Sequence, residues 1–456
     1  MSAAAFDVRA ATSSGSCVPG GTPSSGPQSW CRAHLFDRLN GRSLGARICP
    51  GSTVAFESAA LADRGYEILR TAFVSTYPPR RCGIGTFTHD LAAATGGREI
   101  VALHPPDQLG AYPLEVHHRI RRDVPNDYVA VARALTRCGA GVVSIQHEYG
   151  IWGGADGAHV LDFVRALDVP AVATLHTVLR RPTPTQRRIL VELVRTVAAT
   201  VVMSRSAARL LTEAYGVAPR RLDIIPHGVP DLPLVDPETV KAALDLAGRA
   251  VILSFGLLGP GKGYDLAIEA MPAVVRALPT ACYVILGATH PDLLRREGEA
   301  YRHRLMARVH ELGLADHIRF VDRFVGRAEL GRWLEGADLC VTPYPNLEQI
   351  VSGTLSYAMG AGRAVVSTPY VYATELLADG RGVLVPAGSP DALGAALIEL
   401  LGDPVLRASV GQRAYEHARR MVWSEVGAAY RRLFARVVAA APPPLRIPTS
   451  AATVHA

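Results

Sequence analysis

The sequence predicts an α/β protein of two doubly wound domains, each a parallel β-sheet covered by helices on both faces. The chain has 456 residues, more than one hydrophobic core normally serves. Apolar segments of strand length alternate with amphipathic segments of helix length, and the apolar ones are rich in valine, isoleucine and alanine, as expected of strands buried on both faces. The alternation stops at a proline-rich stretch near the middle and then begins again.

The first series of elements is predicted to form an N-terminal domain at residues 66–230. Its strand–helix pairs, in chain order, are RTAFVS with FTHDLAAA, GVVSIQ with HVLDFVRAL, AVATLH with RRILVELVRTV, and TVVMS with SAARLLTEAYG. The segment 222–238 interrupts the alternation with four prolines and is predicted to be the interdomain linker.

The second series is predicted to form a C-terminal domain at residues 231–423. Its strands are AVILSFG, CYVILG, IRFVD, DLCVTPY, AVVSTP and GVLVPA, with helices between them. One more apolar helix, at 424–440, follows the second sheet. Residues 1–65 are largely rich in serine, glycine and proline, so we expect a disordered segment, and the tail 441–456 is expected to be loose.

The formal net charge is +7, and arginine clusters at 117–123 (HHRIRRD) and 179–188 (LRRPTPTQRR). These clusters indicate either a phosphate-rich ligand or an anionic membrane face, or no more than a solvated surface. Aromatic residues are not interleaved with the charges and no recognition motif occurs, so nucleic acid is not an expected partner.

The chain shows no stretch of about eighteen residues free of charges and turn signals, so no membrane span is predicted. Its N-terminal stretch lacks the features of a signal peptide. The seven cysteines include no C-x-x-C pair and are expected to be reduced thiols. We therefore expect a cytoplasmic protein, and the arginine clusters leave peripheral attachment to the inner membrane face open.

A glycine-containing turn follows the first predicted strand in STYPPRRCGIGTFT. Gly83 and Gly85 lie where the backbone can approach a ligand and the helix N-terminus favours an anion. Thr88 stands where a dinucleotide-binding G-x-G-x-x-G needs its third glycine, which argues against a nicotinamide enzyme. An ordinary tight turn would give the same two glycines.

A second such turn, SFGLLGPGKGYD, contains Gly256 and carries Lys262. A flexible cation among exposed backbone N–H groups suits a phosphate. The turn is not a Walker loop, because Gly263 follows the lysine where serine or threonine is required. The plain alternative is a solvated loop lysine.

Histidines follow two successive strands of the first domain. His147 and Glu148 end one strand in SIQHEYG, and His176 ends the next in TLHT. Side chains at these strand ends lie where ligands bind in doubly wound sheets. A hydrogen-bonded structural histidine is the alternative at each position.

A helix is predicted to start at Ser352, Gly353 and Thr354, just ahead of largely apolar residues. Such a start offers unpaired N–H groups, the positive end of the helix dipole and two hydroxyls. Ordinary N-capping would explain the same residues, but a shared crevice with Lys262 favours an anion site.

In this order, the motifs resemble those of the retaining GT-B glycosyltransferases of family 4. The resemblance covers residues 70–436 and rests on YPPRRCGIGTFT, QHEYG, TLHT, IPHGV, GLLGPGKGYD, VILGATHP, FVDRF, DLCVTPYP and SYAMGAGRAVVSTPY. It implies two Rossmann-like domains facing across a cleft, with the acceptor on the first and the sugar nucleotide mainly on the second. The last helix would cross back to the first domain.

The resemblance also implies roles for individual residues. Gly83 and Gly85 would face the donor phosphates and the acceptor, and His147 would be the active-site histidine. Lys262 matches the lysine that meets the donor diphosphate, and residues 352–354 match the phosphate-facing helix start.

Two departures from the family pattern affect the donor contacts. Gln349 and Tyr357 stand where the family often has the two glutamates of Glu-x7-Glu, and Glu348 would need a register shift to replace the first. Leu257 stands where an arginine usually follows the glycine of the Lys262 turn. We therefore expect Gln349 to contact the donor, with Glu148, His176 and Glu348 as further substrate contacts.

The expected reaction is transfer of a sugar from a nucleoside-diphosphate sugar to a hydroxyl with retention of configuration, with Lys262 and His147 as catalytic residues. The acceptor would be a carbohydrate or a lipid-linked molecule, in polysaccharide or glycolipid biosynthesis. No D-x-D motif occurs, so neither a metal nor a tightly bound cofactor is expected. The missing glutamates leave a sugar-nucleotide sensor open, and an epimerase of similar fold is a further alternative.

Overall fold

The computed structural model divides into two compact units, Met1–Glu67 and Ile68–Ala456. The residues that it describes are 31–37, 42–48, 69–97, 99–106 and 111–441. In the first unit, strands β1 (Cys31–Asp37) and β2 (Arg42–Ile48) pair as an antiparallel hairpin. The rest of the segment expected to be disordered, and nearly all of the tail, lie outside the described residues.

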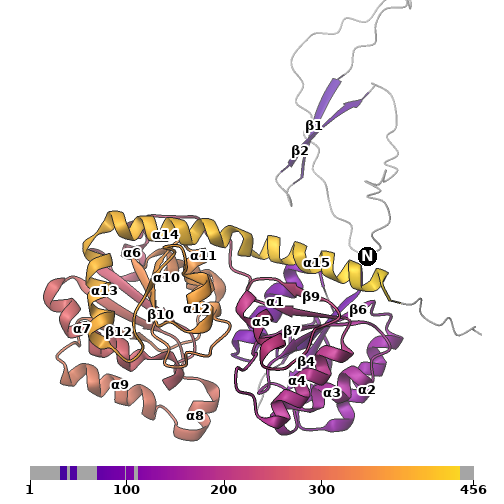
Figure 1. The fold of residues 1–456 in the computed structure, drawn as a ribbon. Coiled ribbons are helices and arrows are strands. Elements are labelled where there is room, and N and C mark those ends of the chain that lie inside the picture. Colours follow the sequence, from indigo (N-terminus) through magenta and orange to yellow (C-terminus); the bar gives the residue numbers. More distant parts are fainter. Residues whose placement is uncertain (1–30, 38–41, 49–68, 98, 107–110, 442–456) are drawn as a thin grey trace, which may run out of the picture. The chain divides into compact units, whose positions relative to one another are not determined.

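The second unit begins with a seven-stranded parallel sheet, which we call the first lobe together with its helices (Figure 1). The strand order is β5-β4-β3-β6-β7-β8-β9. The strands are β3 (Thr71–Ser75), β4 (Glu99–His104), β5 (Val116–Arg121), β6 (Val142–His147), β7 (Ala171–Leu175), β8 (Ala199–Val202) and β9 (Leu222–Ile224). The helices are α1 (Gly83–Thr95), α2 (Pro125–Arg137), η1 (Ala155–Gly157), α3 (His159–Arg165), α4 (Pro184–Thr196) and α5 (Arg205–Glu213).

The second lobe is a six-stranded sheet in the order β12-β11-β10-β13-β14-β15. Its strands, all parallel, are β10 (Ala250–Phe255), β11 (Ala281–Leu286), β12 (Ile318–Val321), β13 (Leu339–Thr342), β14 (Ala364–Ser367) and β15 (Val383–Leu384). Its helices are α6 (Glu238–Lys241), η2 (Ala242–Leu244), η3 (Pro260–Lys262), α7 (Tyr264–Ala277), α8 (Pro291–Glu297), α9 (Ala300–Glu311), α10 (Arg327–Glu335), α11 (Gly353–Gly360), α12 (Val371–Leu376), α13 (Pro390–Gly402), α14 (Pro404–Ala418) and η4 (Arg419–Met421).

These two sheets confirm the predicted fold class of two doubly wound α/β domains. The predicted linker at 222–238 needs one correction, because its first residues form β9, the edge strand of the first sheet. Four prolines masked this strand in the sequence, since only three residues pair with β8 before Pro226.

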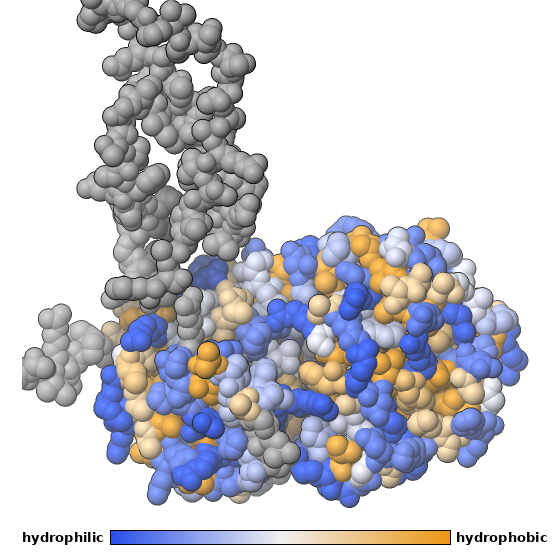
Figure 2. Space-filling view, turned by 180° about the vertical axis from the view of Figure 1, so that it is seen from behind, coloured by the Kyte–Doolittle hydropathy of each residue, from blue (hydrophilic) through white to orange (hydrophobic). Residues whose placement is uncertain are grey.

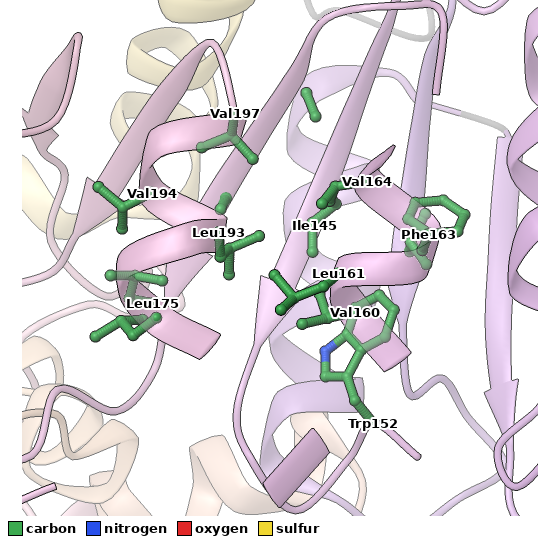
Figure 3. Packing of buried hydrophobic residues seen from close by; sticks show 14 of the residues in the cluster. Ile145, Trp152, Val160, Leu161, Phe163, Val164, Leu175, Leu193, Val194 and Val197 are labelled. Carbon is green, nitrogen blue, oxygen red and sulfur yellow. The ribbon is translucent and has the colours of Figure 1, made fainter. Parts of the chain in front are cut away.

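Apolar side chains from strands and helices fill the space between each sheet and its covering helices. In the first lobe, Ile145 of β6 and Leu175 of β7 face helices α3 and α4, where Phe163 and Leu193 are fully buried (Figure 3). This packing fixes the strands from both sides, so the loops at their carboxyl ends start from rigid positions.

The last helix, α15 (Trp423–Ala439), packs on the first lobe although it follows the second sheet in the chain (Figure 1). Its Tyr430 hydroxyl lies 3.0 Å from Oγ1 of Thr174. Its Phe434 ring meets Phe73 of β3 edge-on, with the centroids 6.2 Å apart. The chain therefore connects the lobes a second time.

Candidate functional site

A cavity of about 530 Å³ lies between the two lobes. On the first lobe, its walls come from the turn between β3 and α1 and from the loops after β6 and β7. On the second lobe, they come from the loops after β10, β11 and β12 and from the start of α11. The carboxyl ends of both sheets thus face one space, where ligands of doubly wound sheets bind.

The cavity walls contain most of the residues that the sequence singled out. Those that line it are Gly83, Glu148, His176, Gly256, Lys262, Gln349, Ser352, Gly353 and Thr354. Three others, Gly85, His147 and Glu348, are not among the lining residues.

Lys262 projects from the second lobe beside an aromatic ring. Its Nζ lies 4.4 Å from the centroid of the Tyr344 ring and 3.3 Å from the Tyr344 hydroxyl. The chain contains only one other lysine, Lys241, which is buried and pairs with Asp338 at 2.7 Å. Apart from these two lysines, the basic side chains that are always charged are arginines. Of the two, the lysine in the cavity is the one that has no buried carboxylate partner among the described residues.

The start of helix α11 forms the wall next to this lysine. Ser352 is its N-cap and accepts a hydrogen bond at 3.2 Å from the backbone N–H of Leu355. The N–H groups of Gly353 and Thr354 precede the first intrahelical bonds and lie at the positive end of the helix. Gly256 has φ +118°, a backbone conformation that places its turn against the Thr354 side chain.

On the first lobe, the two predicted glycines have different surroundings. Gly83 is the first residue of α1 and lines the cavity. Gly85 lies inside the helix, and a Cβ there would be 3.5 Å from the backbone of Thr76. That is an ordinary contact distance, so Gly85 packs against the preceding turn and does not line the cavity.

The residues after β6 and β7 also divide between cavity and core. Glu148 and His176 line the cavity. Glu148 accepts a hydrogen bond from the Thr177 hydroxyl, and burial raises the pKa of its carboxyl group. His176 Nε2 lies 2.9 Å from Oε1 of Gln146, while His147 is fully buried and neither of its ring nitrogens has a partner within the described structure.

Burial keeps these histidines neutral at physiological pH. It lowers the pKa of His147 to about 4, and together with the neighbouring His227 and His147 it lowers the pKa of His176 to about 3. At neutral pH they can therefore form hydrogen bonds as uncharged imidazoles, but they offer no positive charge to attract an anionic ligand.

The low pKa of His147 makes stability depend on pH. Because the unfolded chain binds a proton below about pH 6.5 and the folded chain only below about pH 4, this contribution is intact above pH 6.5 and is lost as the pH falls towards 4. We expect His147→Gln to lose about 2 kcal/mol less unfolding free energy than the wild type between pH 7 and 4.5. Urea unfolding at both pH values, with the exposed His303→Gln as control, measures this; equal losses in all three proteins would contradict it.

Sequence reasoning missed a charged contact between the lobes beside the cavity. Asp90 on α1 is buried and pairs with Arg327 at the start of α10. Tyr357 of α11, which stands at the place of a family glutamate, donates a hydrogen bond to Asp90 at 3.3 Å. Arg327 and Tyr357 both line the cavity. No local motif marks these residues, because they come from both lobes.

The outer side of the cleft holds the remaining predicted contact. Glu348 pairs with Arg181 at 2.8 Å across the lobes, and Gln349, which lines the cavity, donates a hydrogen bond to the backbone oxygen of Val351. Glu348 is thus engaged outside the cavity and does not take the place of the absent glutamate at position 349.

Within the described ranges, no helix is both long and apolar enough to cross a bilayer. Figure 2 shows hydrophilic residues interspersed with smaller hydrophobic groups on one face of the second unit. Attachment to an anionic membrane through the cluster at 179–188 stays a prediction.

Two doubly wound lobes that face each other across a cavity are the architecture of the GT-B class of glycosyltransferases. The solved structure of Anabaena HepE in complex with UDP and glucose matches with a TM-score of 0.66 at 16% identity, over 81% of this chain and 100% of that one. Sucrose-phosphate synthase from Thermosynechococcus elongatus matches with a TM-score of 0.66 at 18% identity, over 82% and 100% of the two chains.

The sequence comparisons identify the family. Residues 81–231 match the profile of Glycosyltransferase Family 4, and residues 249–403 match that of Glycosyl transferases group 1. The phosphatidyl-myo-inositol mannosyltransferase of Mycolicibacterium smegmatis is 30% identical over 282 residues, which are 60% of this chain and 67% of that protein. D-inositol 3-phosphate glycosyltransferase 2 of Catenulispora acidiphila is 30% identical over 238 residues, or 50% and 53% of the two proteins.

This chain belongs to the family 4 glycosyltransferases, as the motifs predicted. The first curated relatives are matched over 53% to 67% of their own length.

Proposed function

We propose that the protein transfers a sugar from a nucleoside-diphosphate sugar to a hydroxyl group and keeps the configuration of the anomeric carbon. The observation that carries this proposal is the joint presence of Lys262 and the open start of α11 on one wall of the interlobe cavity. An ammonium group beside unpaired backbone N–H groups suits a diphosphate.

In this reaction the bond between the sugar and the diphosphate breaks, and negative charge grows on the departing oxygens. Lys262 and the N–H groups at the start of α11 would stabilise that charge, because they are fixed before the reaction begins. The proposal uses no metal ion and no tightly bound cofactor. A donor phosphate oxygen would accept the proton of the attacking hydroxyl.

The first lobe would hold the acceptor and the transferred sugar. Among the described residues that line the cavity, Glu148 is the only carboxylate, and His176 lies beside it at the end of the next strand. Both can accept hydrogen bonds from sugar hydroxyls. His147 would act only indirectly, through Glu148 in this wall. Its buried ring directly precedes Glu148 in the chain and does not line the cavity.

The names of the relatives suggest the class of acceptor. The M. smegmatis relative is named for phosphatidyl-myo-inositol and the C. acidiphila relative for D-inositol 3-phosphate. We propose a polyhydroxylated acceptor, either a carbohydrate or a lipid-linked molecule. The arginines at 179–188 lie on the acceptor lobe, where an acidic headgroup would meet them.

Donor screening tests the proposal. UDP-, GDP- and ADP-sugars are first compared by thermal shift, because a ligand that binds the folded state raises the melting temperature. The donor with the largest shift is then incubated with inositol phosphate, phosphatidylinositol and simple sugars. We expect release of the nucleoside diphosphate together with a glycosylated acceptor.

The other outcomes separate the alternatives. Binding without release under any condition would indicate a sugar-nucleotide sensor. Isomerised donor without an acceptor would indicate an epimerase. No shift with any sugar nucleotide would contradict the proposed function.

A further inference from the structure

Lys262 lies in the cavity against the side chain of Tyr344. The ammonium group lies over the Tyr344 ring, 4.4 Å from its centroid, and 3.3 Å from its hydroxyl. In the described parts of the chain no ion pair joins Lys262 to a carboxylate. The ring attracts the cation without neutralising it, so the positive charge remains available to an incoming anion.

The Tyr344 ring is itself fixed by the second lobe. It is buried and stacks on Tyr370, with the centroids 5.1 Å apart and the planes 16° from parallel. Its backbone oxygen accepts a hydrogen bond of 2.6 Å from the Thr368 hydroxyl. The stacking fixes the ring and the hydrogen bond fixes the backbone that carries it, so this side chain can in turn fix a flexible one.

Tyr344 also connects Lys262 with the start of α11. Burial raises the pKa of the Tyr344 phenol, but the Lys262 ammonium and hydrogen bonds with Thr354 and Ser352 lower it by more, so the net pKa is lowered. The Tyr344 hydroxyl lies 3.3 Å from Lys262, which lines the same cavity as Ser352 and Thr354.

We propose that Tyr344 is the positioning residue that joins Lys262 and the start of α11 into one preorganised diphosphate site. This inference rests on the proposed function. Lysine has a long stem that loses much rotamer freedom when it is fixed. Because the tyrosine holds the ammonium before the ligand arrives, the charge already lies where the leaving diphosphate needs it.

Three variants test this role. Tyr344→Phe keeps the ring but removes the hydroxyl, and Tyr344→Leu removes both. Tyr372→Phe is the matched control, because Tyr372 is equally buried in the same lobe, but its hydroxyl lies 3.0 Å from Ser356 of α11 instead of beside Lys262. Steady-state kinetics with the donor that the wild type uses are measured together with thermal unfolding.

We expect Tyr344→Phe to lower kcat about tenfold, since one hydrogen bond to a charged group is lost. Tyr344→Leu should lower it about a hundredfold, since the ring contact is lost as well. The donor KM should change less than about threefold in both, because the added diphosphate charge exists only in the transition state. Tyr372→Phe should keep wild-type kcat.

Wild-type kcat in Tyr344→Phe and Tyr344→Leu would overturn the proposal, and so would an equal loss in Tyr372→Phe. If Tyr344→Leu does not fold, Tyr344→Phe decides. If the wild type transfers no sugar, the proposed function fails instead, and calorimetry with UDP, GDP and ADP judges Tyr344. Tyr344→Phe must then bind the nucleoside diphosphate more weakly than the wild type does. Unchanged affinity in Tyr344→Phe, or a wild type that binds none of the three, overturns the inference.

Discussion

Replacing Lys262 by alanine is expected to lower kcat for sugar transfer by about 10² to 10³-fold while the protein stays folded. This corresponds to the loss of one preorganised group that stabilises charge in a transition state, about 3 to 4 kcal/mol. Lys262 contacts Tyr344 and forms no ion pair with a described carboxylate, so its removal leaves no buried charge unpaired. Kinetics and thermal unfolding of the same preparation measure both effects.

A matched control separates the lysine's position from its charge. Arg304 is an exposed cation of the same lobe that pairs with Glu297 at 3.5 Å, and Arg304→Ala should keep kcat within about twofold, as for other exposed ion pairs. Lys262→Arg should recover only part of the activity, because a planar guanidinium does not reproduce a compact ammonium. A Lys262→Ala enzyme with wild-type kcat would remove this residue from the mechanism.

The second large effect is expected at the contact between the lobes. Arg327→Ala leaves the buried Asp90 carboxylate of α1 without its guanidinium partner, and unpaired buried charges are costly. Because Arg327 is itself half-exposed, we expect a loss at the lower end of the range, about 3 kcal/mol. At an unfolding entropy of about 2.1 cal/mol/K per residue, that lowers the melting temperature of a protein of this size by roughly 3 to 4 °C.

The control for this prediction is Arg323→Ala, since Arg323 pairs on the surface with Glu329 of its own lobe and should contribute less than about 1 kcal/mol. A double variant, Asp90→Asn with Arg327→Ala, should be less destabilised than the sum of its parts by more than about 1 kcal/mol. Additive losses, or equal losses for Arg323→Ala and Arg327→Ala, would show that the two lobes are not held together by this pair.

The fold could be predicted because its signals are local. Strands buried on both faces leave continuous apolar segments in the sequence, and helices leave amphipathic ones. The start of α11 was predictable for the same reason, since Ser352 caps the helix that it begins. Strand β9 could not be predicted, because three residues ahead of a proline carry too little pattern.

The site was predicted better on the second lobe than on the first. Lys262 lies in a glycine-rich turn after a strand, which is a local pattern that the sequence shows directly. His147 and Glu148 are adjacent at the end of one strand, and alternation sends one side chain into the core and the other to the cavity. The sequence marks the strand end but does not show which residue faces which way.

Contacts between distant segments left no mark in the sequence. Tyr344, beside Lys262, and Arg327, beside Asp90, are joined to their partners only by the packing of loops on helices. The tyrosine at 357 was visible as a departure from the family, but its hydrogen bond to Asp90 depends on how the lobes meet. Such pairs need coordinates, because their spacing in the chain is arbitrary.

The two lysines of this chain allow the central claim to be tested directly. Protein grown with [¹³Cε]lysine should give two side-chain NMR signals, one from the buried Lys241 and one from Lys262, assigned with Lys262→Arg. On titration with UDP, GDP and ADP, and with the donor found by screening, we predict that the Lys262 signal shifts in a saturable manner while the Lys241 signal stays in place. A Lys262 signal that is unmoved by a nucleoside diphosphate shown independently to bind would contradict the account.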